Sequence, residues 1–324
     1  MLLPSSERHA WLKTVCGLAE GAHVATRADA VPTLLRDLQR REALLGGRAG
    51  LPRSLSSIAA STVCRFLSHG FQGVARRSFR CFNGFSIAVT PDGNWLLERS
   101  VYWLTVYRAV DGVRFKSVVV DYHENKEAHV CVSPDGVVFL PSALGSCISV
   151  LTLPELERCG ALGVGLLHAP AGACASRDVV AVSEPDMNRV SVLRRDTGAL
   201  SHRFGHGFVD YPVGLCFTHN YSRIAVASRS GVFAITVFDA GGEFLHDAPL
   251  TQNGWRQGSV DVGCLASGEL VFLNDNKLTV FYAEGTHVLA EASQGSPFFR
   301  NGFCTDGTAV YRLDREMDSV IVCA

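Results

Sequence analysis

A repeat of 42 to 45 residues constrains this 324-residue chain more than any other feature of its sequence. Each copy contains several short apolar runs separated by turn residues, and such runs indicate β-strands. One valine aligns the second run of each copy: Val106, Val150, Val192, Val237, Val280 and Val322. A period of about 40 to 45 residues with several strands per unit is typical of a β-propeller, in which each unit forms a four-stranded blade. The sequence therefore predicts an all-β fold with one blade for each of these six copies.

The clearest copy occupies residues 174–218, and its motifs resemble the repeat of the NHL family of six-bladed propellers. The NHL unit reads roughly Pro-x-Gly-Val-Ala-Val, Asp-Gly, Val-Ala-Asp and Asn-His-Arg-Val-x-Val-Phe. The matching segments here are Pro212-x-Gly214, the turn SPDG at 133–136, VAV at 180–182 and NRVSVL at 188–193. The resemblance covers about residues 82–324 and implies a six-bladed ring.

Apolar residues at helical spacing precede the repeats. Trp11, Val15 and Leu18 predict one short amphipathic helix, and a leucine-rich stripe at 31–45 predicts a second. We therefore expect two parts, a helical and basic extension at 1–60 and a propeller at 61–324. The extension either packs on the propeller or binds a partner.

The last copy ends one strand short, at Ala324. The segment LSH at 67–69 repeats the LSH at 200–202, which belongs to the outer strand of the clearest copy. A strand supplied from before the first blade would complete the last blade and remove the open sheet edges. We expect residues 65–70 to be that strand.

The chain contains 11 cysteines but no CxxC pair and no Cys/His spacing typical of zinc sites. Five of them recur near the start of successive copies and are predicted to be buried, unpaired thiols: Cys131, Cys174, Cys216, Cys264 and Cys304. Reduced thiols favour an intracellular protein, with the cytoplasm as the expected location. The chain has no apolar run of membrane-spanning length, and Glu7, Arg8 and His9 interrupt the region where a signal peptide would be apolar.

Charge is distributed unevenly along the chain. Residues 1–80 carry a net +7 and the remainder −8. Arg76, Arg77 and Arg80 alternate with phenylalanines, which keeps single-stranded RNA binding open as an alternative. The acidic remainder would repel a phosphate backbone, so nucleic acid is not the favoured partner.

Polar residues near the starts of the inner strands are expected to line the central channel: Asn83, His129, Asp261 and Asn301, with Glu127 beside His129. Some six-bladed propellers are enzymes that hold calcium or zinc at such a ring. Hard cations usually require several carboxylates, so we expect no resident metal or other cofactor. A channel-metal hydrolase or lyase remains the alternative from the enzyme class.

Common catalytic motifs are absent, since the sequence lacks GxSxG, a Walker loop, GxGxxG and HExxH. The favoured function is therefore a non-catalytic scaffold that binds a protein or peptide on one loop face. We expect the acidic side chains of that face to be exposed and to attract a basic partner: Glu124, Glu127, Glu184, Asp186, Asp210, Asp275, Asp314 and Glu316.

Overall fold

A computed structural model describes residues 77–80, 84–120, 128–218, 220–229, 233–249, 260–265, 268–274, 277–281, 288–293, 303–305, 310–314 and 319–323. All of these residues belong to one compact unit that spans Ala75–Cys323. The predicted helical extension, 1–60, lies outside the described residues. Within the described ranges the helical element is the 3-10 turn η2 (Pro185–Met187), and no helix there is long and apolar enough to cross a membrane.

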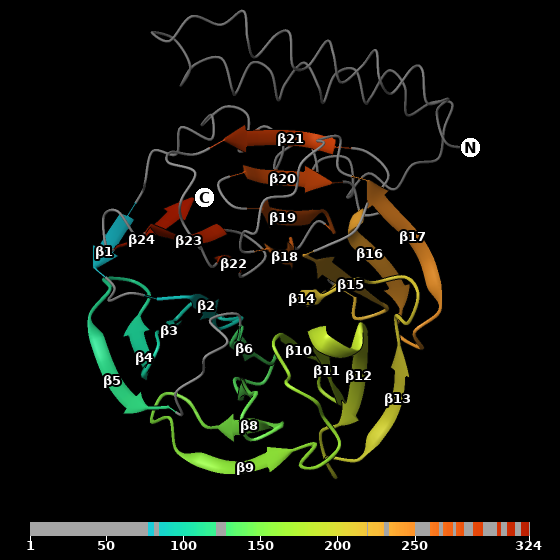
Figure 1. The fold of residues 1–324 in the computed structure, drawn as a ribbon. Coiled ribbons are helices and arrows are strands. Elements are labelled where there is room, and N and C mark those ends of the chain that lie inside the picture. Colours follow the sequence, from blue (N-terminus) through green and yellow to red (C-terminus); the bar gives the residue numbers. More distant parts are fainter. Residues whose placement is uncertain are drawn as a thin grey trace, which may run out of the picture. The chain divides into compact units, whose positions relative to one another are not determined.

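The described strands form six antiparallel sheets of four strands each (Figure 1). The first two sheets contain β2 (Ser86–Val89), β3 (Trp95–Arg99), β4 (Trp103–Arg108) and β5 (Arg114–Val119), then β6 (Cys131–Val132), β7 (Val138–Ser142), β8 (Cys147–Leu151) and β9 (Arg158–Leu162). The next two contain β10 (Ala173–Ala175), β11 (Val179–Glu184), β12 (Arg189–Arg194) and β13 (Leu200–Phe204), then β14 (Pro212–Phe217), β15 (Arg223–Ser228), β16 (Phe233–Asp239) and β17 (Phe244–Pro249). The fifth contains β18 (Val260–Cys264), β19 (Leu270–Asn274), β20 (Lys277–Phe281) and β21 (Val288–Ser293). The sixth combines β22 (Phe303–Thr305), β23 (Val310–Asp314) and β24 (Ser319–Cys323) with β1 (Arg77–Arg80).

The first strand of each sheet contacts the first strand of the next. These contacts run in a closed circuit, from β2 to β6, β10, β14, β18 and β22 and back to β2. Within each of the first five sheets the strands follow chain order from the inside outward. Sheets arranged around an axis in this way form a β-propeller, so the predicted all-β propeller architecture is confirmed.

The sixth sheet is completed by a strand from before the first sheet, as expected. β1 pairs antiparallel with β24, with Arg77 opposite Val322 and Arg80 opposite Ser319. The predicted position of this strand was wrong, because β1 occupies the free edge of β24 and lies further along the chain than residues 65–70. A three-residue echo such as LSH carries too little pattern to fix a strand's position or register.

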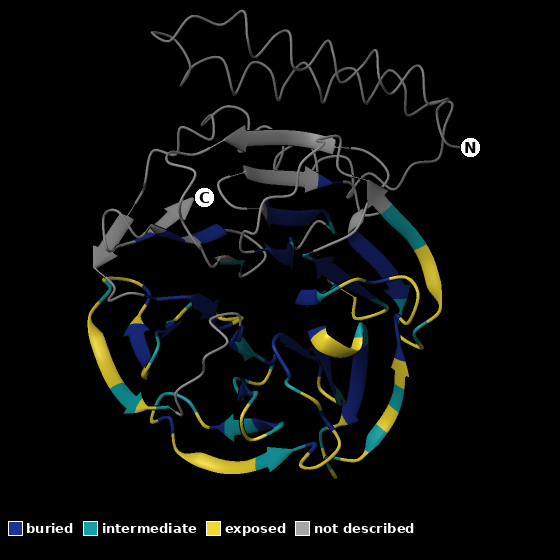
Figure 2. Ribbon diagram, in the orientation of Figure 1, coloured by how far each residue is buried: buried dark blue, intermediate teal, exposed yellow. Residues whose placement is uncertain are grey.

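The core lies between neighbouring sheets. In the third strands the repeated valines Val106, Val192 and Val237 are at most 1% exposed and Val150 is partly buried, which explains why an apolar residue recurs at this place in the sequence. Figure 2 shows buried residues on the inner strands and exposed residues along outer strands such as β5 and β9. The repeat is therefore the record of one packing position used in successive sheets.

The cysteines of the inner strands have a packing role. Cys174 is buried, and Cys131 and Cys216 are partly buried free thiols. Burial raises the pKa of Cys131 to about 12 and raises the pKa values of Cys174 and Cys216 as well. These three thiols are thus poor nucleophiles. The predicted burial holds for Cys174, whereas Cys131, Cys216, Cys264 and Cys304 are only partly buried, so for these four the prediction was wrong.

Candidate functional site

Four neighbouring inner strands place residues in one layer at the channel end. In each of these sheets, one inner-strand residue pairs with a residue near the centre of the second strand: Cys131↔Phe139, Cys174↔Ala181, Cys216↔Ala225 and Gly263↔Val271. The residue two positions earlier in the sequence belongs to the layer. The residues of this layer are His129, Gly172, Gly214 and Asp261. The two middle sheets thus contribute glycines, and the two outer ones contribute ionisable side chains.

The glycines are required by close approach of the backbones. A Cβ on Gly172 would lie 1.9 Å from the carbonyl oxygen of Val213. A Cβ on Gly214 would lie 2.8 Å from both the Cα and Oδ1 of Asp261. The Asp261 carboxylate therefore occupies space that a side chain at position 214 would fill, which explains the Pro-x-Gly motif.

His129 and Asp261 meet across the axis. The Nδ1 atom of His129 lies 3.0 Å from Oδ2 of Asp261, and the two side chains are 8% and 11% exposed. The second oxygen, Oδ1, accepts a hydrogen bond from the backbone N–H of Val262 at 2.9 Å. The two strands come from sheets separated by two others in the circuit, so the pair links opposite sides of the ring.

This pair joins two members of the predicted channel ring, while Asn83 and Asn301 lie outside the described residues. Among the described residues the Nδ1 atom of His129 makes no hydrogen bond, so the two groups are in close polar contact without forming a hydrogen-bonded pair. Within the described ranges, no three His, Cys, Asp or Glu side chains gather in a way that could hold a metal ion.

Tyr211, at the start of the fourth sheet, has a strained backbone. Its φ of 53° lies in the left-handed region, which bulky residues rarely adopt. The side-chain oxygen of Asn188 accepts a hydrogen bond from the Tyr211 backbone N–H at 2.9 Å, and the N–H of Arg229 donates to the Tyr211 carbonyl at 3.0 Å. The Arg229 guanidinium also lies 5.7 Å from the centre of the tyrosine ring. Strain held by several contacts is a feature of functional positions.

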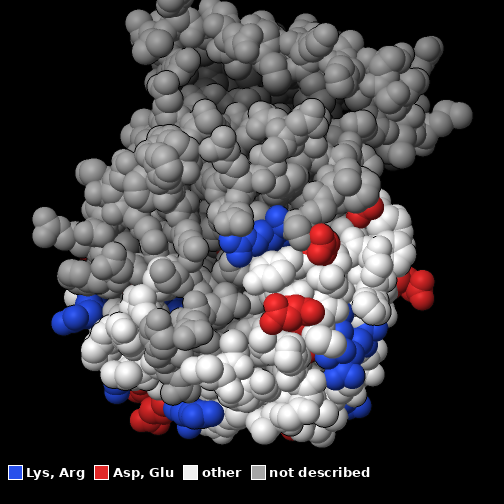
Figure 3. Space-filling model, viewed as in Figure 1, with Lys and Arg blue, Asp and Glu red and all other residues white. Residues whose placement is uncertain are grey.

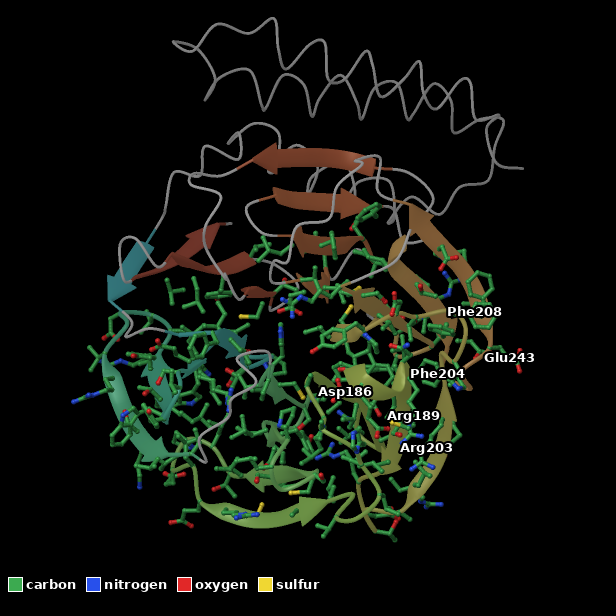
Figure 4. The ribbon with its side chains drawn as sticks, viewed as in Figure 1. Asp186, Arg189, Arg203, Phe204, Phe208 and Glu243 are labelled. Carbon is green, nitrogen blue, oxygen red and sulfur yellow. The ribbon has the colours of Figure 1, made fainter. Side chains whose placement is uncertain are left out.

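Asp186 lies beside this tyrosine. Burial raises the pKa of Tyr211, and the nearby Asp186 carboxylate raises it further. Asp186 is exposed and belongs to η2, on the face where second strands turn into third strands (Figure 4). Asp210 is also exposed, in the loop that enters β14. These two residues are surface carboxylates, as the sequence predicted.

Glu184 is not an exposed carboxylate, so that expectation was wrong. Its side chain is 0% exposed and accepts two hydrogen bonds of 2.9 Å from Arg189 and one of 2.7 Å from the His168 backbone N–H. The Ser191 hydroxyl donates to it as well. Burial raises the pKa of Glu184, but the hydrogen bonds from Arg189 and Ser191 outweigh burial, and the pKa lies below its usual value.

The remaining predicted face residues are placed as follows. Asp314 is the last residue of β23 and pairs with Ser319, so its backbone belongs to a strand. The other four lie outside the described residues: Glu124, Glu127, Asp275 and Glu316.

Exposed apolar side chains on this same face were missed from the sequence. They lie in or next to the loops that join second to third strands or one sheet to the next: Tyr102, Trp103, Leu144, Val164, Leu166, Met187 and Phe208. Figure 3 shows that the described part of this face is largely uncharged, with acidic and basic groups both present. Single apolar residues in turns form no periodic pattern, so no sequence signal identified these residues.

Comparisons with known proteins support the fold. No protein-family model matches the chain, and no curated protein sequence matches it. A streptogramin B lyase structure is similar with a TM-score of 0.53 and 13% identity, over 76% of this chain and 86% of that one. A Kuenenia stuttgartiensis hydrazine synthase is similar with a TM-score of 0.52 and 15% identity, over 73% of this chain and 82% of that one. At such low identity these similarities establish the propeller fold alone, and the NHL assignment stays a prediction.

Proposed function

We propose that this protein is an intracellular scaffold of the six-bladed, NHL-like type that binds a protein or peptide on its loop face without catalysis. The loop face consists of the loops that join second to third strands and of the loops that join successive sheets. Rigid sheets hold these loops in place, and binding residues are often found on such loops.

The observation that carries the proposal is the set of exposed apolar side chains on this face. Leu144 is 73% exposed, Val164 67% and Phe208 52%. Phe208 also stacks on Phe244, with ring centroids 4.7 Å apart, which extends the apolar surface to the outer edge of the ring. Exposed apolar side chains also lie elsewhere, as at Val110, Val119 and Tyr221, but those of the loop face belong to loops held by rigid sheets, where binding residues are common.

The charges on this face refine the kind of partner. Asp186 and Asp210 would attract basic groups, while Arg203 and Arg229 lie among the same loops and neighbouring strands. We therefore infer that the partner contributes apolar side chains in the middle of the interface and a small number of basic groups at its edge.

The test is affinity purification of the tagged chain and two variants from its native cells, with quantitative mass spectrometry. Leu144→Glu places a charge on the loop face, and Val113→Glu places the same charge on an exposed valine, 53% exposed, on the opposite side of the sheets. We expect at least one protein to be captured by wild type and Val113→Glu and to be reduced about tenfold or more with Leu144→Glu. Equal capture by all three proteins would contradict the proposal.

A channel-centred lyase or hydrolase is the second candidate. The His129–Asp261 pair favours it, because it brings an imidazole and a carboxylate, side chains that enzymes often use as general acids and bases, within 3.0 Å of each other on the axis. Metal analysis of purified protein distinguishes the candidates, since stoichiometric calcium or zinc would favour the enzyme.

A further inference from the structure

Arg99 is a buried cation between the first and second sheets. It ends β3 and is 1% exposed. Its partner across the strand pair is Ser86, whose hydroxyl accepts a hydrogen bond from the Val130 backbone N–H at 3.0 Å. Directly paired residues point to the same side of a sheet, so Arg99 also points toward the start of β6. There its Nη1 donates a long hydrogen bond of 3.5 Å to the carbonyl oxygen of Ala128.

The other two nitrogens of Arg99, Nε and Nη2, are buried and have no hydrogen-bond partner among the residues that the structure describes. In Arg189 the same two nitrogens, Nε and Nη2, each donate a hydrogen bond of 2.9 Å to one carboxylate oxygen of Glu184. Burial alone lowers the pKa of Arg99 to about 10. A buried cation without an anion is strongly disfavoured, so the unpaired Nε and Nη2 of Arg99 favour the binding of an anion at this position.

The fold itself does not require an arginine here. Ser183 occupies the equivalent position of the third sheet. Arg99 lies two residues after Leu97, which pairs with Val106, and Ser183 lies two residues after Ala181, which pairs with Val192. Its neutral hydroxyl donates to the carbonyl of Val213 at 2.9 Å, which is the same sheet-to-sheet bridge that Arg99 makes at 3.5 Å. In the fourth sheet, Ala227 fills this position. A smaller uncharged residue therefore serves the packing at least as well.

We propose that Arg99 binds the carboxylate of a small-molecule ligand through its Nε–H and Nη2–H groups. A planar carboxylate matches this edge of a guanidinium with two parallel hydrogen bonds. The site lies beside the channel axis, because Ala128 directly precedes His129 of the axial pair. Arg99 directly precedes the loop at 100–102 that belongs to the loop face, but carboxylate binding there does not require the proposed protein partner.

Acetate is the probe for this site, compared with chloride at equal ionic strength, and the melting temperature of the full chain is the readout. For wild type we expect tens of millimolar acetate to raise the melting temperature by a few degrees more than chloride does. Arg99→Met should lose this response and, without acetate, should melt no lower than wild type, because an apolar side chain replaces an unpaired charge. Arg99→Lys keeps the charge but cannot donate two parallel hydrogen bonds to a carboxylate, so it should lose most of the acetate-dependent rise in melting temperature. Arg108→Met, at an exposed arginine on β4, should respond like wild type.

Two results would overturn the proposal. One is an equal effect of acetate and chloride on wild type, and the other is an undiminished acetate response in Arg99→Met. A further variant, Glu127→Gln, tests whether the chain itself supplies the carboxylate, because Glu127 directly precedes Ala128 in the sequence. If acetate stabilises Glu127→Gln but not wild type, the chain provides the anion and the ligand proposal is wrong.

Discussion

The Glu184 carboxylate is the most heavily bonded acidic group in the described residues, with Arg189, Ser191 and the His168 backbone as donors. Replacing Glu184 with Ala would leave these buried donors without an acceptor. We expect unfolding free energy to fall by about 3 to 5 kcal/mol, as is usual when one partner of a buried ion pair is removed. Asp111→Asn is the matched control, because the Arg108–Asp111 pair is exposed and should change stability little. Urea denaturation measures the unfolding free energy of both variants. Similar small losses of stability in the two would show that the hydrogen bonds to Glu184 contribute little.

Asp135 links the second and third sheets through Arg195. The guanidinium donates to both oxygens of Asp135, at 2.9 and 3.0 Å, and lowers the pKa of this carboxyl to about 2. An unfolded aspartate titrates near about 3.9. The pair therefore stabilises the fold fully above that value, and its contribution is lost as pH falls from about 4 to about 2. Asp135→Asn should show a shallower loss of stability over this range in urea denaturation, and parallel pH profiles for the two proteins would contradict this.

Only some of these residues could be predicted from the sequence. It identified His129 and Asp261 as channel residues, because the repeat places both near the start of an inner strand. It misjudged Glu184, because the partners that bury this charge, Arg189 and Ser191, belong to the next strand and are matched to it only by register. Burial of a charge depends on such partners, which linear spacing does not identify.

At the scale of elements, β1 is the strand that closes the ring. Its four residues, Arg77–Arg80, pair with β24 and cover an edge that would otherwise be open. We expect deletion of residues 1–83 to reduce unfolding free energy by roughly 2 to 4 kcal/mol, from the lost backbone hydrogen bonds alone. Deletion of residues 1–74 retains β1 and should have a much smaller effect. Thermal melts of the two truncated chains test this, and equal melting temperatures would contradict a closing role for β1.

The strands inside each sheet could be predicted because their apolar runs recur at a fixed period. The closing strand could not be positioned in this way, since Arg-Ser-Phe-Arg at 77–80 lies outside the repeated pattern. Phe79, opposite Val320, is the single apolar residue of this four-residue strand. Hydrophobic pattern sets register most strongly, and four residues with a single apolar member provide little of it.

At the scale of the whole molecule, the spacing of the sheets at the axis depends on glycine. Gly214→Ala would place a Cβ 2.8 Å from the Cα of Asp261, so one of the two inner strands would have to shift. Overpacking of this kind usually costs about 1 to 3 kcal/mol, and the shift would also separate Asp261 from His129. Gly160→Ala is the matched control, because a Cβ there meets no atom within 4 Å and should leave stability nearly unchanged. Urea denaturation measures the loss, and the NMR chemical shifts of the His129 ring report whether its carboxylate neighbour has moved. If Gly214→Ala and Gly160→Ala match wild type in both measurements, the inner strands are not in close contact at the axis.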